Sequence, residues 1–172
     1  MILIGLGASL PFCGRSPQEN IARAANALHR LGEVTDRSRL YASPAWPDPT
    51  DPAFVNAVIA LRTGLGPEPL LAALNAIEAA FGRRRTKKYG PRTLDLDLLD
   101  YDGLIRTGEE GEGALILPHP GIAMREFVLR PLSDVEPEWR HPLTGESAES
   151  LLAKVEKPEV IPIDAGWEAP AA

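Results

Sequence analysis

Two aspartates, Asp95 and Asp97, stand two positions apart and follow a strongly basic segment of the chain. The stretch 94–101 alternates leucine with aspartate, which predicts a strand whose i and i+2 side chains share one face about 6.5 to 7 Å apart. Two carboxylates at that spacing can bind a pair of magnesium ions that lie roughly 3.5 to 4 Å apart. For an isolated Asp-x-Asp, a pair of solvent-facing acids on a half-buried strand is the more common alternative.

The segment before the aspartates concentrates positive charge. Six of the 18 Lys and Arg residues fall within ten positions that contain no acid, namely Arg83, Arg84, Arg85, Lys87, Lys88 and Arg92. Because the whole chain has a net charge of −6, this basic loop favours a small polyanion over general affinity for nucleic acid. A solvated charged turn is the alternative for the loop alone. Next to an acid pair, however, the loop predicts phosphoryl transfer, with metal on one side of the phosphates and arginine on the other.

The elements expected around these residues are short strands and two amphipathic helices. Strands are expected at 2–6, 35–41, 54–61 and 94–101. One helix is expected from Pro17 to a stop at Gly32, after a capping box of Ser16 and Glu19, and another from about Pro67 to Phe81. Weaker signals follow as a mixed segment at 127–132, a short helix near 148–155 and a strand at 160–163.

The order βαββαβ with additions predicts an α+β fold. Its core is ferredoxin-like, extended into a three-layer α/β/α sandwich with a mainly antiparallel sheet. A 44% hydrophobic and 24% charged content is ordinary for a globular fold and excludes disordered, collagen-like and membrane classes. We therefore expect a single domain over residues 1–172, ending in a mobile tail over about 164–172.

The apolar start of the chain, Met1 to Leu10, raises the question of a signal peptide. It has no basic region before it, and bulky Phe12 precedes Cys13 where processing needs small residues, so no such signal is expected. No stretch approaches the roughly 20 apolar residues of a membrane span. We expect a cytoplasmic monomer with small-molecule substrates and no membrane or nucleic-acid partner.

One segment, residues 88–99, reads KYGPRTLDLDLL and resembles the signature of the 6-hydroxymethyl-7,8-dihydropterin pyrophosphokinase family. Three further blocks agree with the family in order and spacing: YASP at 41–44 with Pro52, Phe54 and Asn56; Glu78 with Gly82, Arg83 and Arg85; and LPHP at 117–120 with Arg125, Phe127 and LRPL at 129–132. The resemblance covers roughly residues 2–140 and leaves the C-terminal part unexplained.

The resemblance implies transfer of the β,γ-pyrophosphoryl group of ATP to the hydroxymethyl oxygen of the dihydropterin, with release of AMP, in folate biosynthesis. It implies Asp95 and Asp97 as catalytic residues and ligands of two Mg²⁺ ions. It also implies that Arg83 and Arg92 hold the phosphates and offset charge that develops in the transition state. The other nucleotide-binding residues that it implies are Arg85, Leu98, His119 and Arg125.

The same resemblance places the pterin between Phe54 and Phe127. Asn56 would hydrogen bond to the polar edge of the pterin, while the backbone around Ser43 and Pro44 closes one side. The residues support this arrangement, since Phe54 and Asn56 point the same way from one strand and offer a stacking ring and an amide. Taken singly, a phenylalanine is more often part of a core.

Two other classes of function compete with this interpretation. One is a ferredoxin-like module that senses a pterin or nucleotide without turning it over, and the other is a metal-dependent nuclease. The presence of both aspartates together with Arg83 and Arg92 argues against the sensor, because stacking a pterin needs no magnesium pair. The net charge of −6 argues against the nuclease. The loops 10–16, 43–54 and 83–91 are expected to close over the substrates.

Overall fold

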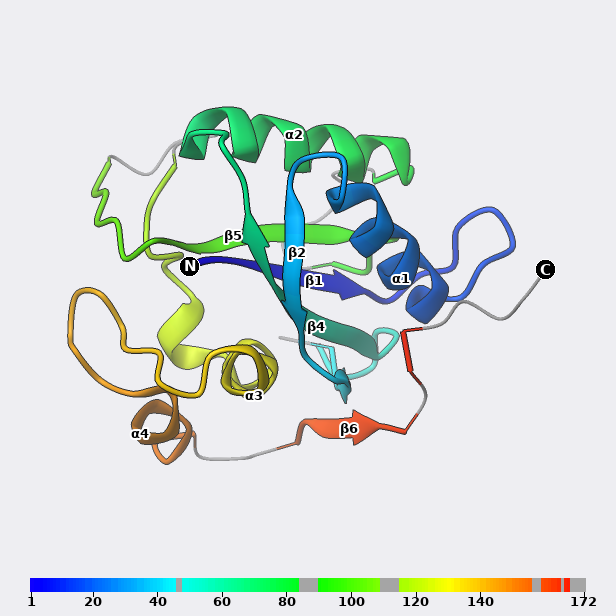
Figure 1. Ribbon diagram of the computed structural model, residues 1–172. Helices are drawn as coiled ribbons and strands as arrows, with labels where there is room; N and C mark the ends of the chain where they lie inside the picture. The colour runs from blue at the N-terminus through cyan, green and yellow to red at the C-terminus, as the bar shows by residue number, and fades with distance from the viewer. Residues whose placement is uncertain (46–47, 84–89, 109–114, 156–158, 165, 168–172) are drawn as a thin grey trace.

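The described part of the chain forms an antiparallel sheet and four α-helices, shown as a computed structural model in Figure 1. The structure describes residues 1–172 except 46–47, 84–89, 109–114, 156–158, 165 and 168–172. The six strands are β1 (Ile2–Ala8), β2 (Glu33–Arg37), β3 (Leu40–Ser43), β4 (Phe54–Arg62), β5 (Asp95–Tyr101) and β6 (Ile161–Ile163). Their order is β5-β1-β4-β3-β6, with β2 also pairing with β4. All pairings among the described strands are antiparallel, as expected.

The prediction of one strand at 35–41 is wrong in detail. Two strands, β2 and β3, occupy this region, and both pair with β4. Ser38 lies between them and is 2% exposed. Its backbone N–H donates to the Val58 carbonyl at 2.9 Å, and its hydroxyl accepts from the Val58 N–H at 3.0 Å. A side chain thus replaces part of the regular ladder while the buried backbone groups stay satisfied. Counted together, β2 and β3 fill the place of the second strand of a βαββαβ core.

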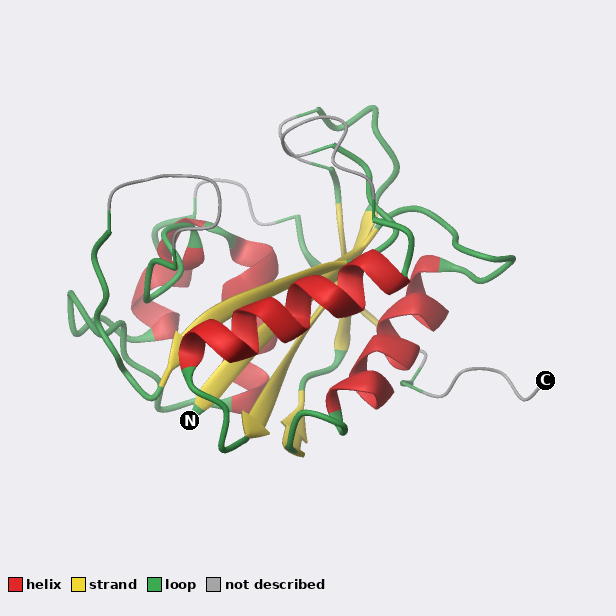
Figure 2. Ribbon diagram, turned by 90° about the horizontal axis from the view of Figure 1, so that it is seen from above, coloured by secondary structure: helices red, strands yellow, loops and turns green. Residues whose placement is uncertain are grey.

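Helices cover both faces of the sheet, which confirms the three-layer arrangement (Figures 1 and 2). On one face lie α1 (Pro17–Leu28) and α2 (Pro67–Ala80), and on the other lie α3 (Glu126–Val135) and α4 (Ala148–Leu152). Each face has its own cluster of buried apolar side chains. The capping box at the start of α1 is confirmed, with Ser16 Oγ accepting from the Glu19 N–H at 3.3 Å and Glu19 Oε2 accepting from the Ser16 N–H at 2.8 Å.

The segment 127–132, which the sequence left as mixed, lies inside helix α3. Pro131 prevented the prediction of a helix here, since proline removes a backbone donor and is disfavoured in a helix interior. Val128, Leu129 and Leu132 are nevertheless all buried against the sheet at helical spacing. Burial of this apolar face therefore outweighs the local cost of the proline.

The C-terminal strand expected at 160–163 is present as β6 and pairs with β3. Trp167 follows it, and its indole N–H donates to the Ser38 carbonyl at 2.7 Å. The single-domain boundary and the mobility of residues 164–172 stay predictions, as does closure of the three loops. Among the helices that the structure describes, none is long and apolar enough to cross a membrane.

Candidate active site

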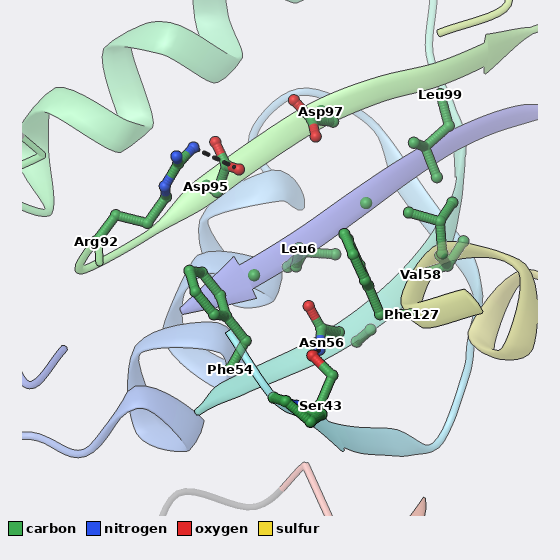
Figure 3. A pocket seen from close by; sticks show the side chains of 15 residues that line it. Leu6, Ser43, Phe54, Asn56, Val58, Arg92, Asp95, Asp97, Leu99 and Phe127 are labelled. Carbon is green, nitrogen blue, oxygen red and sulfur yellow. Dashed lines mark hydrogen bonds and ion pairs between the residues drawn. The ribbon is translucent and has the colours of Figure 1, made fainter. Parts of the chain in front are cut away.

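A cleft lies on the α3 side of the sheet, where β5, β1 and β4 run side by side (Figure 3). Its empty space amounts to about 680 Å³, which includes open solvent at its mouth. Its floor is β1, which contributes Gly5 and Gly7 and therefore no side chain at these two positions. Gly7 pairs with Asn56 of β4 on one side and with Asp95 of β5 on the other. Neighbouring strands are about 4.8 Å apart, so the backbones of Asn56 and Asp95 lie roughly 9.5 Å apart across an open floor.

The five residues predicted to bind the pterin all line this cleft, namely Ser43, Pro44, Phe54, Asn56 and Phe127. Figure 3 shows the rings of Phe54 and Phe127 on different elements around the same space. The Asn56 side chain is buried, and its Nδ2 donates to Ser43 Oγ at 2.9 Å. This hydrogen bond fixes the amide and leaves its Oδ1 on the side of the floor, 3.6 Å from where a Cβ on Gly7 would stand.

Asp95 is held between two arginines. Arg92 Nη1 donates to Asp95 Oδ2 at 2.8 Å, and Arg83 Nη1 lies 2.9 Å from Asp95 Oδ1 (Figure 3 draws the first contact). Arg83 also forms an ion pair with Glu78, whose carboxylate accepts from the Leu96 N–H at 2.6 Å. Two of the arginines predicted from the sequence thus converge on the first aspartate.

Asp97 lies on the same face of β5 as Asp95, in surroundings that disfavour its ionised form. Burial, and then the neighbouring Asp95 carboxylate, raise the pKa of Asp97 to about 7, against the lowering effect of Arg125. The side chain keeps 33% of its exposure, so solvent screens part of this effect. Two carboxylates that repel each other at one end of a cleft are a favourable place for a divalent cation.

His119 and Arg125 complete this end of the site. The Gly121 N–H donates to His119 Nδ1 at 3.0 Å, so the other ring nitrogen, Nε2, carries the proton of the neutral ring. Nε2 lies 3.9 Å from Asp97 Oδ1. Burial, and then Arg125, lower the pKa of His119 to about 4, so the ring is a neutral donor at pH 7. The Arg125 guanidinium lies 5.8 Å from the centre of the Phe127 ring and packs where a Cβ on Gly121 would stand.

Comparison with known proteins assigns the chain to a family. The family model described as 7,8-dihydro-6-hydroxymethylpterin-pyrophosphokinase (HPPK) matches residues 3–137. A 2-amino-4-hydroxy-6-hydroxymethyldihydropteridine pyrophosphokinase from Synechocystis sp. is 41% identical over 96% of this chain and 82% of that protein. A protein of the same name from Pseudomonas aeruginosa is 40% identical over 88% of this chain and 90% of that protein. The chain belongs to the HPPK family.

The fold agrees with this family. The crystal structure of Plasmodium falciparum HPPK-DHPS superposes with a TM-score of 0.67 at 13% identity, over 89% of this chain and 44% of that longer chain. At this identity the likeness shows the fold alone, and this chain spans less than half of the Plasmodium one. Sequence relatives that match along most of their length support a pyrophosphokinase, a transferase of folate biosynthesis, over the sensing module.

Four residues that hold the candidate site together were given no role from the sequence. Ser9 and Leu10 donate their backbone N–H groups to the Arg92 carbonyl at 2.9 and 3.0 Å, and Ser9 Oγ accepts from the Arg92 N–H at 3.1 Å. Buried Asn20 donates to the carbonyls of Leu10 and Thr93. Glu78, noted only as part of a motif, anchors Arg83. The sequence feature that could have indicated such a role is Asn20, a polar residue beside the apolar face of α1.

Arg85 and Leu98 were both predicted to contact the nucleotide. Arg85 lies outside the described residues. The Leu98 side chain is 3% exposed and packs in the core on the face opposite Asp97. A nucleotide contact at Leu98 would therefore use its backbone, which belongs to the edge strand β5.

Proposed function

We propose that this member of the HPPK family transfers the pyrophosphoryl group of ATP to 6-hydroxymethyl-7,8-dihydropterin in a magnesium-dependent reaction. One observation carries the proposal: an aromatic cleft with a fixed amide lies across β1 from two carboxylates, and Arg83 and Arg92 contact the first of them. A pterin needs the first half of this arrangement, and a magnesium-bound triphosphate needs the second.

The pterin would lie over the Gly7 end of β1, because Gly7 carries no side chain there, whereas the Leu99 side chain packs over Gly5. Its faces would stack on Phe54 and Phe127, and its donor edge would meet the Oδ1 of Asn56. Since Asn56 and Asp95 pair with the same glycine from opposite sides, a pterin anchored at Asn56 directs its far end toward the aspartates.

Asp95 and Asp97 are the residues that would hold magnesium. Within the described part of the chain, no cluster of three or more His, Cys, Asp or Glu side chains could hold a metal ion. An acid pair fits the usual magnesium site next to a nucleotide, which water and phosphate oxygens complete. When bound, magnesium supplies positive charge that lowers the repulsion between the phosphates and the attacking oxygen.

The arginines would change partners when the nucleotide binds. Arg83 and Arg92 contact Asp95 in the structure, and a phosphate group offers the same paired oxygens to a guanidinium. Arg125 and the neutral His119 add donors at the Asp97 end. The chain's own contribution is thus to orient two substrates and to hold positive charge where the transferred group carries negative charge.

An assay of products tests the proposal. The protein is incubated with ATP, magnesium and 6-hydroxymethyl-7,8-dihydropterin, and AMP and the pterin pyrophosphate are expected in equal amounts. Omission of the pterin, or addition of EDTA, should stop AMP formation. Release of ADP would show ordinary phosphoryl transfer, and ligand binding without any AMP would favour the sensing module. Cytoplasmic location and a monomeric state stay part of the proposal.

Gly7→Ala is expected to weaken pterin binding while leaving the fold intact. The added methyl would lie 3.6 Å from Asn56 Oδ1 and 3.8 Å from atoms of Asp95 and Phe54, which are ordinary contacts. The methyl would nevertheless occupy the floor of the cleft, at a cost of about 1 to 3 kcal/mol in binding free energy. Calorimetry measures the effect. Gly64→Ala is the control, because a Cβ there meets nothing within 4 Å.

A further inference from the structure

Glu126, the first residue of α3, is a buried carboxylate that the proposed reaction does not use. It is 7% exposed. Its Oε2 accepts from the backbone N–H groups of Glu159 at 2.8 Å and Val160 at 3.3 Å, and its Oε1 accepts from Arg130 Nε at 3.1 Å. A buried carboxylate is costly unless donors satisfy it. Two of the donors here come from a segment more than 30 residues away, so the carboxylate joins α3 to the C-terminal part of the chain.

The C-terminal segment, defined as the described residues 159–164 and 166–167, lies along the edge of the sheet beside β3 (Figure 1). Ile161 and Ile163 in β6 pair with Ala42 and Leu40 of β3. Trp167 then donates to the Ser38 carbonyl at 2.7 Å. A strand edge that would otherwise be open is thereby covered.

On each side of the pterin cleft, this segment contacts a residue that directly precedes a cleft residue in the sequence. Glu126 directly precedes Phe127, the ring on the α3 side. Ala42, which pairs with Ile161, directly precedes Ser43 on the other side. The far end of α3 is bound to β3 directly, because Asp134 contacts Arg39 and Tyr41. The end of α3 that carries Phe127 is linked to β3 through the C-terminal segment.

We propose that Glu126 is a positioning residue for the pterin site, which holds Phe127 in place by binding the C-terminal segment. The inference rests on the proposed function and extends it to a part of the chain beyond residues 3–137, the range that the family model matches. Glu126 contacts no substrate in this proposal. It acts through Phe127, so its loss should affect pterin affinity far more than nucleotide affinity.

Glu126→Ala tests this in the full-length protein, with Arg130→Ala as the matched control. Arg130 is the other partner of the carboxylate and lies one turn further along the same helix. In Glu126→Ala, the dissociation constant of 6-hydroxymethyl-7,8-dihydropterin is expected to rise about fivefold or more, as when a stacked ring is displaced. The dissociation constant of a non-hydrolysable ATP analogue should change far less. Hydrogen exchange at residues 159–163 should become faster, and Arg130→Ala should match the wild type in all three measurements.

Three results would overturn the inference. One is a Glu126→Ala protein with faster exchange at 159–163 and wild-type pterin affinity. Another is an equal loss of affinity for both ligands, and the third is an equal loss in Arg130→Ala. If Glu126→Ala does not fold, Glu126→Gln replaces it, since the amide keeps one acceptor oxygen and should give a smaller loss in the same direction. Absence of pterin binding by the wild type would instead contradict the proposed function itself.

Discussion

Asp97→Asn is expected to lower the rate of AMP formation by roughly 10³-fold or more, because it removes charge that would hold magnesium against the phosphates. The substitution keeps the size and shape of the side chain, so the cleft should remain open. Pterin binding without nucleotide should therefore stay close to that of the wild type. Initial rates of AMP formation and calorimetric titration with the pterin measure the two effects. Turnover at the wild-type rate by a folded Asp97→Asn protein would exclude Asp97 as a magnesium ligand.

The same variant should be more stable than the wild type when no metal is bound. The pKa of Asp97 is raised from 3.8 to about 7, so the folded protein binds a proton that the unfolded chain releases between these values. The free energy of unfolding of the wild type therefore falls as the pH rises through this range. Asparagine does not ionise and avoids the loss. In EDTA, the melting temperature of Asp97→Asn should exceed that of the wild type more at pH 8 than at pH 5.

This pairing of lost activity with gained stability separates a metal site from an ordinary surface acid. If Asp97 were only a solvent-facing aspartate, the alternative for an isolated Asp-x-Asp, its replacement by asparagine would change neither the rate of AMP formation nor the stability of the protein. Glu33→Gln is a suitable control, because Glu33 is 64% exposed and pairs with Arg62 on the surface. Its effect on both measurements should be small.

The local pattern of the chain was enough to predict the acid pair and most of the sheet. Alternation of leucine and aspartate from position 94 fixes which side chains share a face, and this holds whatever the strand pairs with. The capping box at Ser16 is equally local. These features involve residues at most a few positions apart, so the sequence contains all of the information that they need.

Features that depend on distant partners could not be predicted. Ser38 divides the second strand because its hydroxyl meets the Val58 N–H, 20 residues away. The helix around Pro131 is stabilised by burial against a sheet whose location the sequence does not specify. Glu126 likewise gains its role only when residues 159 and 160 approach it. Polar residues at buried positions are the common element, but their burial is known only once the fold is known.

Arg92→Ala is expected to lower the catalytic rate by about 10²- to 10³-fold, with a smaller effect on pterin binding. The Arg92 side chain is only 17% exposed, and its guanidinium is fixed by two contacts, since Nη1 lies 2.8 Å from Asp95 and Nε donates to the Gly90 carbonyl at 3.1 Å. The Arg92 backbone is held by Ser9. A cation fixed in this way before the reaction needs no reorganisation when negative charge grows on the transferred group.

Kinetics at two salt concentrations distinguish this role from a general effect of positive charge. If Arg92 acts at a fixed position, the single-turnover rate should fall by the same factor at low and high salt, because a buried contact is little screened. Arg92→Lys should recover only part of the rate, since an ammonium group keeps the charge but lacks the planar fork. Arg106→Ala removes the same charge from a surface pair with Glu68 and should leave the rate unchanged. A loss confined to ATP affinity that disappears at high salt would instead mean that Arg92 only raises the local positive potential.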